Sequence, residues 1–195
     1  NMAELMKKEL ANFPVQYKII VNKENRGFAG GHNQAFKESD AEYILLLNQD
    51  MYLAPDCLEK IVMFLDQHPE TAAISPRLMK WDFPKNFTDQ IDALGLKVYR
   101  SRRVVEQYAQ QNWLDLKRRV SMDVTRHDFA KSNKLPTAVL PVFGVSGALP
   151  VFRTSALKSV VYQDGAIFDE SYHSYKEDVD LAWRLAAGGY KSHVL

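Results

Sequence analysis

Apolar residues along the chain follow two different periods, one typical of strands and one of helices. Residues 43–47 (YILLL) form a continuous apolar run bounded by polar residues, as expected for a strand buried on both faces of a sheet. After Pro55, apolar residues return at the i, i+3, i+4, i+7 spacing of one helix face, from Leu58 to Leu65. Residues 72–75 (AAIS) follow as a further short strand.

Helical and strand-like segments also alternate toward both ends of the chain. The N-terminal pattern predicts a helix over 2–13, a strand over 17–21, a glycine-rich turn over 25–31 and a helix over 32–38. The C-terminal pattern predicts two short apolar runs within 137–152, a helix over about 176–187 that stops at Gly188 and Gly189, and a strand from Tyr190. This order favours an α/β layered sheet.

The periodic pattern weakens between Trp81 and Pro136, where the chain is polar. Arginine and lysine cluster there at 100–103 and 117–119. We interpret this stretch as an insertion of a hairpin or irregular loops, with room for one helix. Such basic clusters are typical of a solvent-exposed face. The alternative is that their side chains contact an anionic acceptor.

Composition narrows the class of protein without naming its chemistry. The 195 residues include 25 Lys and Arg against 24 Asp and Glu, which argues against a nucleic-acid binder. Cys57 is the single cysteine, so no internal disulfide framework is possible and a reducing compartment is favoured. Proline and glycine interrupt the longest apolar stretch, 138–152, so it does not resemble a membrane span. These features predict a cytoplasmic protein.

The first segment that could carry chemistry is glycine-rich and lies between a predicted strand and a predicted helix, at 25–33 (NRGFAGGHN). Glycines there would let backbone N–H groups approach a phosphate near the helix N-terminus. The spacing of Gly27, Gly30 and Gly31 matches neither the dinucleotide fingerprint nor a P-loop. A tight turn that needs glycine dihedral angles is the alternative.

Two further segments are acidic. Asn48-Gln49-Asp50 directly follows the apolar run 43–47, where open α/β sheets place their ligands, and a carboxylate there could hold Mg²⁺ or Mn²⁺. The alternative is that Asp50 is an ordinary turn residue.

Residues 168–180 contain five carboxylates at the start of the last predicted helix. Asp178 could serve there as a general base, whereas acids that complement the helix dipole are the simpler explanation.

Five stretches in this order together resemble the family-two glycosyltransferases of the GT-A fold, and in particular bacterial rhamnosyltransferases. They are NKENRGFAGGHNQA (22–35), YILLLNQDMYLAPDCLEKIV (43–62), IDALGL (91–96), VFGVSGALPVFRTSAL (142–157) and FDESYHSYKEDVDLAWRLAAGGYK (168–191). The resemblance implies a Rossmann-like, mostly parallel sheet flanked by helices. It also implies an inverting transferase that uses Mg²⁺ or Mn²⁺.

The resemblance assigns a role to each segment. Asp50 would bind the metal, Asp178 would be the catalytic base within the Glu177-Asp178 pair, and Gly144 to Leu149 would line the donor and acceptor pocket. The residues implied on the donor side are Asn25, Gly27, Gly30, Gly31, Asn33, Asn48, Gln49, Asp50 and Gly147. Those implied on the acceptor side are Ser146, Gly147 and Trp183.

The resemblance also implies the partners. The donor would be a nucleotide-diphosphate sugar, with rhamnose as one candidate, and the acceptor a hydroxyl of a saccharide or lipid-linked molecule in cell-surface polysaccharide synthesis. Such an enzyme would work in the cytoplasm, in peripheral association with the inner face of the membrane, and would bind no nucleic acid.

The chain departs from the family pattern in two ways. Asn48 occupies a position where the family usually has a carboxylate. Nothing before Tyr17 matches the nucleotide-binding strands with which the family begins, and the family usually continues beyond Leu195. We therefore expect 1–195 to be a fragment of one catalytic domain, with a variable insertion at about 97–136. A nucleotidyltransferase and a non-catalytic nucleotide-sugar or carbohydrate-binding module are the alternatives.

Overall fold

The computed structural model describes residues 2–82, 86–124, 139–172 and 175–195. Its helices are α1 (Met2–Glu9), α2 (Gly27–Phe36), α3 (Cys57–Gln67), α4 (Trp113–Val124), α5 (Thr154–Ser159), α6 (Glu177–Ala187) and the 3₁₀ turn η1 (Glu170–Tyr172). Its strands are β1 (Tyr43–Leu45), β2 (Thr71–Ser75), β3 (Leu78–Asp82), β4 (Asn86–Ala93), β5 (Leu96–Val98), β6 (Val104–Glu106), β7 (Leu140–Val142), β8 (Val151–Arg153) and β9 (Lys191–Val194). No described helix is both long and apolar enough to cross a membrane.

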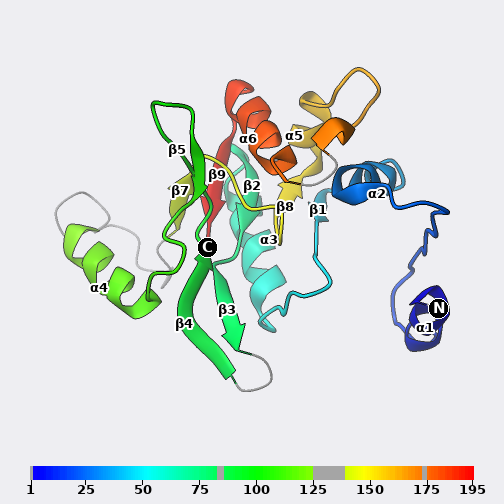
Figure 1. Cartoon of the computed structure of the whole chain (residues 1–195), viewed down its shortest axis with the longest axis horizontal. Helices are drawn as coiled ribbons and strands as arrows, with labels where there is room; N and C mark the ends of the chain where they lie inside the picture. Colours follow the sequence, from blue (N-terminus) through cyan, green and yellow to red (C-terminus); the bar gives the residue numbers. More distant parts are fainter. Residues whose placement is uncertain (1, 83–85, 125–138, 173–174) are drawn as a thin grey trace.

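A mixed five-stranded sheet lies at the centre, in the order β1-β8-β2-β9-β7 (Figure 1). Only β2 and β9 run parallel among its described pairs, whereas β1–β8, β2–β8 and β7–β9 are antiparallel. The α/β class is confirmed, but the expectation of a mostly parallel sheet is wrong. Strand β8 follows β7 with no helix between them, and antiparallel strands, unlike parallel ones, need no crossover helix to connect them.

Helices cover both faces of this sheet. On one face, Ile61 and Leu65 of α3 pack against Ile74 of β2 and Val151 of β8. On the other face, α2, α5 and α6 pack against the sheet in a cluster that includes Ala29, Phe152, Leu157, Leu181 and Leu185. Successive residues of β8 face opposite sides, as strand geometry requires. The predicted stripe is thus confirmed at Ile61 and Leu65, whereas Leu58 and Val62, which were also expected to be buried, are exposed.

The apolar run 43–47 is not buried on both faces as predicted. Its residues 43–45 are half-buried, Leu46 is buried and Leu47 is 47% exposed. In the described part of the chain β1 is the outermost strand, so its free side reduces its burial. The strand that is buried throughout is β2.

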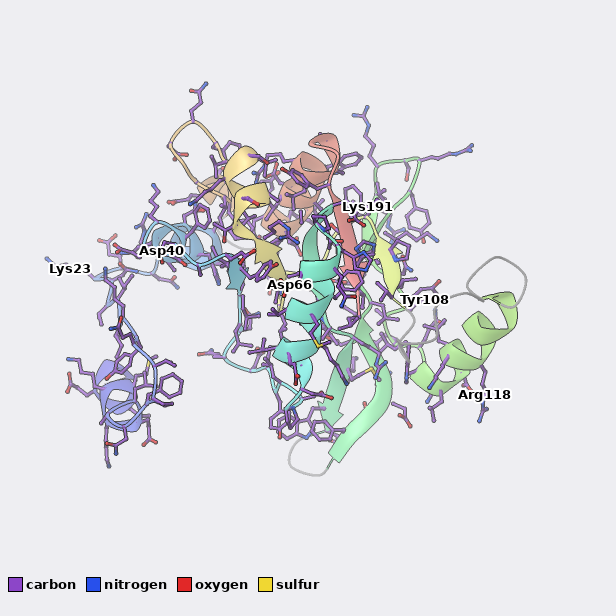
Figure 2. All side chains as sticks on the ribbon, turned by 180° about the vertical axis from the view of Figure 1, so that it is seen from behind. Lys23, Asp40, Asp66, Tyr108, Arg118 and Lys191 are labelled. Carbon is purple, nitrogen blue, oxygen red and sulfur yellow. The ribbon has the colours of Figure 1, made fainter. Side chains whose placement is uncertain are left out.

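The predicted strand over 17–21 is also not observed. These residues are mostly exposed, with Val21 at 67%, and they pair with no described strand. A strand needs the amides of a neighbour to satisfy its own backbone groups, so β-type composition alone cannot form one. Figure 1 shows α1 standing apart from the sheet at the end of this extended segment, and Figure 2 shows Lys23 on the same segment.

The polar stretch after Trp81 contains more regular structure than its pattern indicates. The hairpins β3–β4 and β5–β6 are followed by α4, which lies at the opposite end of the molecule from α1 (Figure 1). Leu116 of α4 packs with Ile91 of β4 and Val194 of β9, which ties this region to the sheet. The predicted hairpin and helix are therefore present, as β3–β4, β5–β6 and α4. Residues 125–136 of the predicted insertion lie outside the described residues.

Candidate functional site

Three of the segments selected from the sequence converge at Gly147. Its backbone N–H donates to Oδ2 of Asp178 over 3.2 Å. A Cβ at this glycine would lie 3.5 Å from Cζ of Phe28 in α2 and 3.7 Å from Oε1 of Glu177. The next residue, Ala148, accepts a hydrogen bond from the Asn48 backbone N–H over 3.2 Å. The loop before β8 therefore joins the starts of α2 and α6 to the loop after β1.

Asp178 is held by backbone groups in the first turn of α6. Its Oδ1 accepts from the N–H of Val179 over 2.8 Å, and Oδ2 accepts from Gly147. Tyr175 and Lys176 precede the helix with φ of 70° and 77°, a left-handed conformation that is costly for side chains other than glycine. The strained entry fixes the direction from which α6 starts, and with it the position of the carboxylate.

The far part of α6 is anchored by Arg184. Its guanidinium pairs with Asp180 at 2.7 Å and donates to the carbonyls of Val160 and Ile167. Because the Ile167 carbonyl belongs to the segment that also contacts α2, this arginine links the two helices that flank Gly147. The helix ends at Ala187, and Gly189 adopts a φ of 82°, so the predicted helix and its glycine stop are confirmed.

Glu177 differs from its neighbour Asp178 in being almost entirely buried. It is 5% exposed, and its Oε2 has no hydrogen-bond partner among the described residues. Burial raises the pKa of this carboxyl above its ordinary value, and the Asp178 carboxylate adds to the effect. Glu177 is therefore less suited than Asp178 to exchange protons with bulk water.

A further carboxylate, Glu106 at the end of β6, also belongs to this site and was missed by the sequence reasoning. Ser146 donates a hydrogen bond to it, and its Oε2 is buried without a partner in the described structure. Burial, with smaller contributions from the carboxylates of Asp178 and Asp92, raises the pKa of Glu106 to about 7 against the lowering effect of Ser146 and Lys176. No motif surrounds Glu106 in the sequence, so only the fold of the hairpin brings it here.

The Asn48-Gln49-Asp50 segment forms a turn after β1. The N–H of Met51 donates to the Asn48 carbonyl, and the side chains of Gln49 and Asp50 are exposed. Asp50 lines a cavity of about 740 Å³ that also contains Asp92. The described residues contain no group of three side chains that could hold a metal by themselves. A lone accessible carboxylate still fits Mg²⁺ or Mn²⁺ that completes its shell with water and diphosphate oxygens.

The glycine-rich segment is the beginning of a helix and not the predicted turn. Helix α2 begins at Gly27 and not at His32. Asn25 Oδ1 accepts the Gly27 N–H over 2.8 Å, and Gly27 has a φ of 68°. At Gly30 a Cβ would lie 3.1 Å from that of Arg26, whereas at Gly31 no atom lies within 4 Å. Glycine is therefore needed for backbone shape at Gly27 and for packing at Gly30, and Gly31 leaves open space.

Asn33 acts in this structure as a connector. It is 2% exposed, and its Oδ1 accepts the backbone N–H groups of Ile167 and Phe168 at 3.0 and 2.9 Å. Its Nδ2 donates to the Phe168 carbonyl and to Glu170. These bonds occupy the whole amide and fasten α2 to the segment that leads into α6. Direct donor contact by Asn33 stays a prediction.

Two of the three residues expected on the acceptor side, Ser146 and Trp183, are placed differently. Ser146 lies beside Gly147 and contacts Glu106. Trp183 is 44% exposed and its ring lies 4.8 Å from that of Phe143. Trp183 follows Asp178 by more than one helical turn and lies on a different side of α6. Its role in acceptor binding stays a prediction.

Comparison with known proteins identifies the family through the first part of the chain. Residues 3–116, more than half of the chain, match the family model described as glycosyl transferase family 2. A protein of Haemophilus influenzae named an uncharacterized glycosyltransferase is 29% identical over 72 residues, which cover 37% of this chain and 26% of that protein. The chain thus matches about a quarter of that relative's length. Because the family model covers α2, β1, the Asp50 turn and both hairpins, the chain belongs to glycosyl transferase family 2.

Proposed function

We propose that this chain is part of the catalytic domain of an inverting glycosyltransferase that moves a hexose from a nucleotide-diphosphate donor to a hydroxyl of a saccharide or lipid-linked acceptor. The observation that supports this most is the carboxylate of Asp178, which two backbone N–H groups hold beside Gly147. Around the same glycine lie the start of α2 and the turn that carries Asp50. Family membership supplies the reaction class.

Asp178 would act as the general base. A positioned carboxylate takes the proton from the acceptor hydroxyl as its oxygen attacks the anomeric carbon. The bond from that carbon to the diphosphate oxygen breaks, the configuration inverts, and the nucleoside diphosphate leaves with the electron pair. The fixed entry to α6 keeps the base in place during this step, and binding both substrates side by side supplies much of the acceleration.

The donor side would be formed by α2 and the turn after β1. The first turn of α2 presents backbone N–H groups that can contact phosphate oxygens, near Asn25, Gly27, Gly30 and Gly31. Asp50 would hold Mg²⁺ or Mn²⁺, which when bound offsets the charge of the leaving diphosphate. Asn48 and Gln49, which directly precede Asp50, would lie beside the metal.

The substrates are the least constrained part of the proposal. Rhamnose, a cell-surface polysaccharide product, and work at the inner face of the membrane come from the resemblance to rhamnosyltransferases. No described residue discriminates one hexose from another on its own. We therefore propose rhamnose as the first donor sugar to test and not as the conclusion.

The Asp178→Asn variant tests the mechanism. In the full-length protein we expect transfer to fall about 100- to 10,000-fold, because the amide cannot accept the proton, while calorimetry still detects metal-dependent binding of the nucleotide sugar. Asp40→Asn is the matched control, since Figure 2 shows Asp40 on the surface segment between α2 and β1. Unchanged transfer in Asp178→Asn would refute the assignment. Donor binding without any turnover by the unaltered full-length protein would instead favour the binding module.

A further inference from the structure

Tyr52, Trp81 and Phe87 form an exposed group that we call the aromatic cluster. The ring centroids lie 5.5 Å apart for Tyr52–Trp81 and Tyr52–Phe87, and 5.6 Å apart for Trp81–Phe87. The three residues are 58%, 44% and 66% exposed. All three line the cavity that contains Asp50.

Backbone geometry places these rings together. Trp81 of β3 and Phe87 of β4 are directly opposite in the antiparallel register, so their side chains lie on the same face of the hairpin. Tyr52 comes from the turn after β1, two residues beyond Asp50. In Figure 1 the β3–β4 hairpin extends away from the central sheet, next to one end of α3.

Hairpin stability does not account for the whole cluster. A cross-strand aromatic pair contributes to pairing of β3 with β4, but Tyr52 lies on neither strand. Three large aromatic side chains that stay exposed while touching one another form a contiguous apolar surface. Such surfaces with polar surroundings mark binding sites on soluble proteins.

The cavity connects the aromatic cluster to the candidate site. Asp50 and Asp92 line it together with the three rings. The Asp92 carboxylate is close enough to Glu106 to raise the pKa of Glu106, and the Asp178 carboxylate does the same. Asp92 therefore belongs to the same cavity as the aromatic cluster, and its carboxylate lies near Glu106 of the candidate site.

Charge along the cavity favours a neutral ligand. Among its described lining residues, Asp50 and Asp92 are balanced by Arg77 and Lys80. Arg77 lies 3.9 Å over the ring of Trp113, and Lys80 donates to Gln110 over 2.8 Å. A surface that binds anionic lipid needs an excess of cations. Aromatic faces beside scattered hydrogen-bonding groups are the surface expected for a sugar ring.

We propose that the aromatic cluster is the platform on which a pyranose ring of the acceptor saccharide stacks. The inference rests on the proposed function, since it identifies the acceptor as a carbohydrate and places it at the Asp50 cavity. Pyranose C–H bonds carry slight positive charge and match the negative faces of aromatic rings. The ring hydroxyls can bond to the carboxylate of Asp92 and the ammonium of Lys80 along the cavity wall.

The test uses the 195-residue chain with 5-fluorotryptophan at its three tryptophans. Fluorine resonances report on Trp81, Trp113 and Trp183 separately, each assigned by a Trp→Phe variant. The probes are the methyl glycosides of glucose, galactose, N-acetylglucosamine, mannose and rhamnose. We expect at least one to shift the Trp81 resonance saturably. Phe87→Ala or Tyr52→Ala should weaken that binding about three- to tenfold.

Tyr99→Ala is the matched control. Tyr99 directly follows strand β5 of the β5–β6 hairpin, is 47% exposed and does not line this cavity. The Tyr99→Ala variant should bind the glycoside as tightly as the unaltered chain does. If no glycoside moves Trp81, or if Phe87→Ala binds as tightly as the unaltered chain, the platform is refuted. Binding of phosphatidylglycerol vesicles through the cluster, without glycoside binding, would also refute it.

A separate titration of the full-length protein with UDP and Mn²⁺ distinguishes the two proposals. If a glycoside binds at Trp81 but neither nucleotide nor nucleotide sugar binds near Asp50, the transferase proposal fails and the platform stands. If nucleotide binds and no glycoside does, the platform alone fails.

Discussion

Replacing Glu106 by glutamine should change how the stability of the chain depends on pH. Glu106 lies beside Ser146 and the Asp178 carboxylate, and burial raises its pKa from 4.5 to about 7. In the unfolded chain the same carboxyl titrates near its ordinary value. Between those two values the folded chain holds a proton that the unfolded chain has released. The contribution of this proton to the unfolding free energy is therefore complete below the unfolded-state pKa of Glu106. It is lost as the pH rises toward and past 7.

The magnitude follows from the two pKa values. Each unit of difference corresponds to about 1.4 kcal/mol, so ionised Glu106 costs roughly 3 kcal/mol in the folded chain at high pH. Between about pH 5.5 and pH 8.5 the unaltered chain should lose about 2 kcal/mol of unfolding free energy through this group. Glutamine keeps the size and can still bond to Ser146, but it cannot ionise. Glu106→Gln should therefore gain about 2 kcal/mol relative to the unaltered chain over this range.

Urea unfolding followed by circular dichroism at the two pH values measures the difference. Glu59→Gln is the matched control, because it removes a carboxylate from an exposed position on α3. A stability difference between Glu106→Gln and the unaltered chain that is the same at both pH values would refute the reasoning. So would a Glu59→Gln control whose stability difference from the unaltered chain changes with pH as much as that of Glu106→Gln.

Three further predictions address packing and the metal. Asn33→Ala should lower the unfolding free energy by about 2–4 kcal/mol, because it leaves buried backbone groups of the adjoining segment without partners; urea unfolding measures this, and a loss below about 0.5 kcal/mol would contradict it. Gly144→Ala should lower the unfolding free energy by about 1–3 kcal/mol, since its Cβ would overlap that of Ala182. Gly31→Ala should instead raise it by about 0.5 kcal/mol in thermal unfolding, because the space there is open. Asp50→Asn should weaken Mn²⁺-dependent nucleotide binding at least about tenfold in calorimetry, and equal binding with and without EDTA in the unaltered chain would rule out the metal.

Much of the local structure was predictable because it depends on neighbours in the chain. The stripe from Leu58 to Leu65 and the glycine stop after Ala187 each belong to one helix, and both are present. Where pairing with distant strands decides the outcome, local pattern was insufficient. Residues 17–21 have β-type composition but no described partner, and residues 43–47 form an outer strand although their sequence matches a buried one.

The candidate site shows the same division. The residue types and order of the glycine-rich segment, the Asp50 turn and the Glu177-Asp178 pair were enough to indicate the family, because each segment carries its own short motif. The tertiary structure alone decided that these segments meet at Gly147, that Asn33 fastens two of them together, and that Glu106 joins them. Burial and long-range contacts set the pKa of Glu106 and assemble the aromatic cluster, and both arise from residues far apart in the chain. A sequence pattern records what each segment favours, whereas proximity between segments exists only once the sheet and its helices have packed.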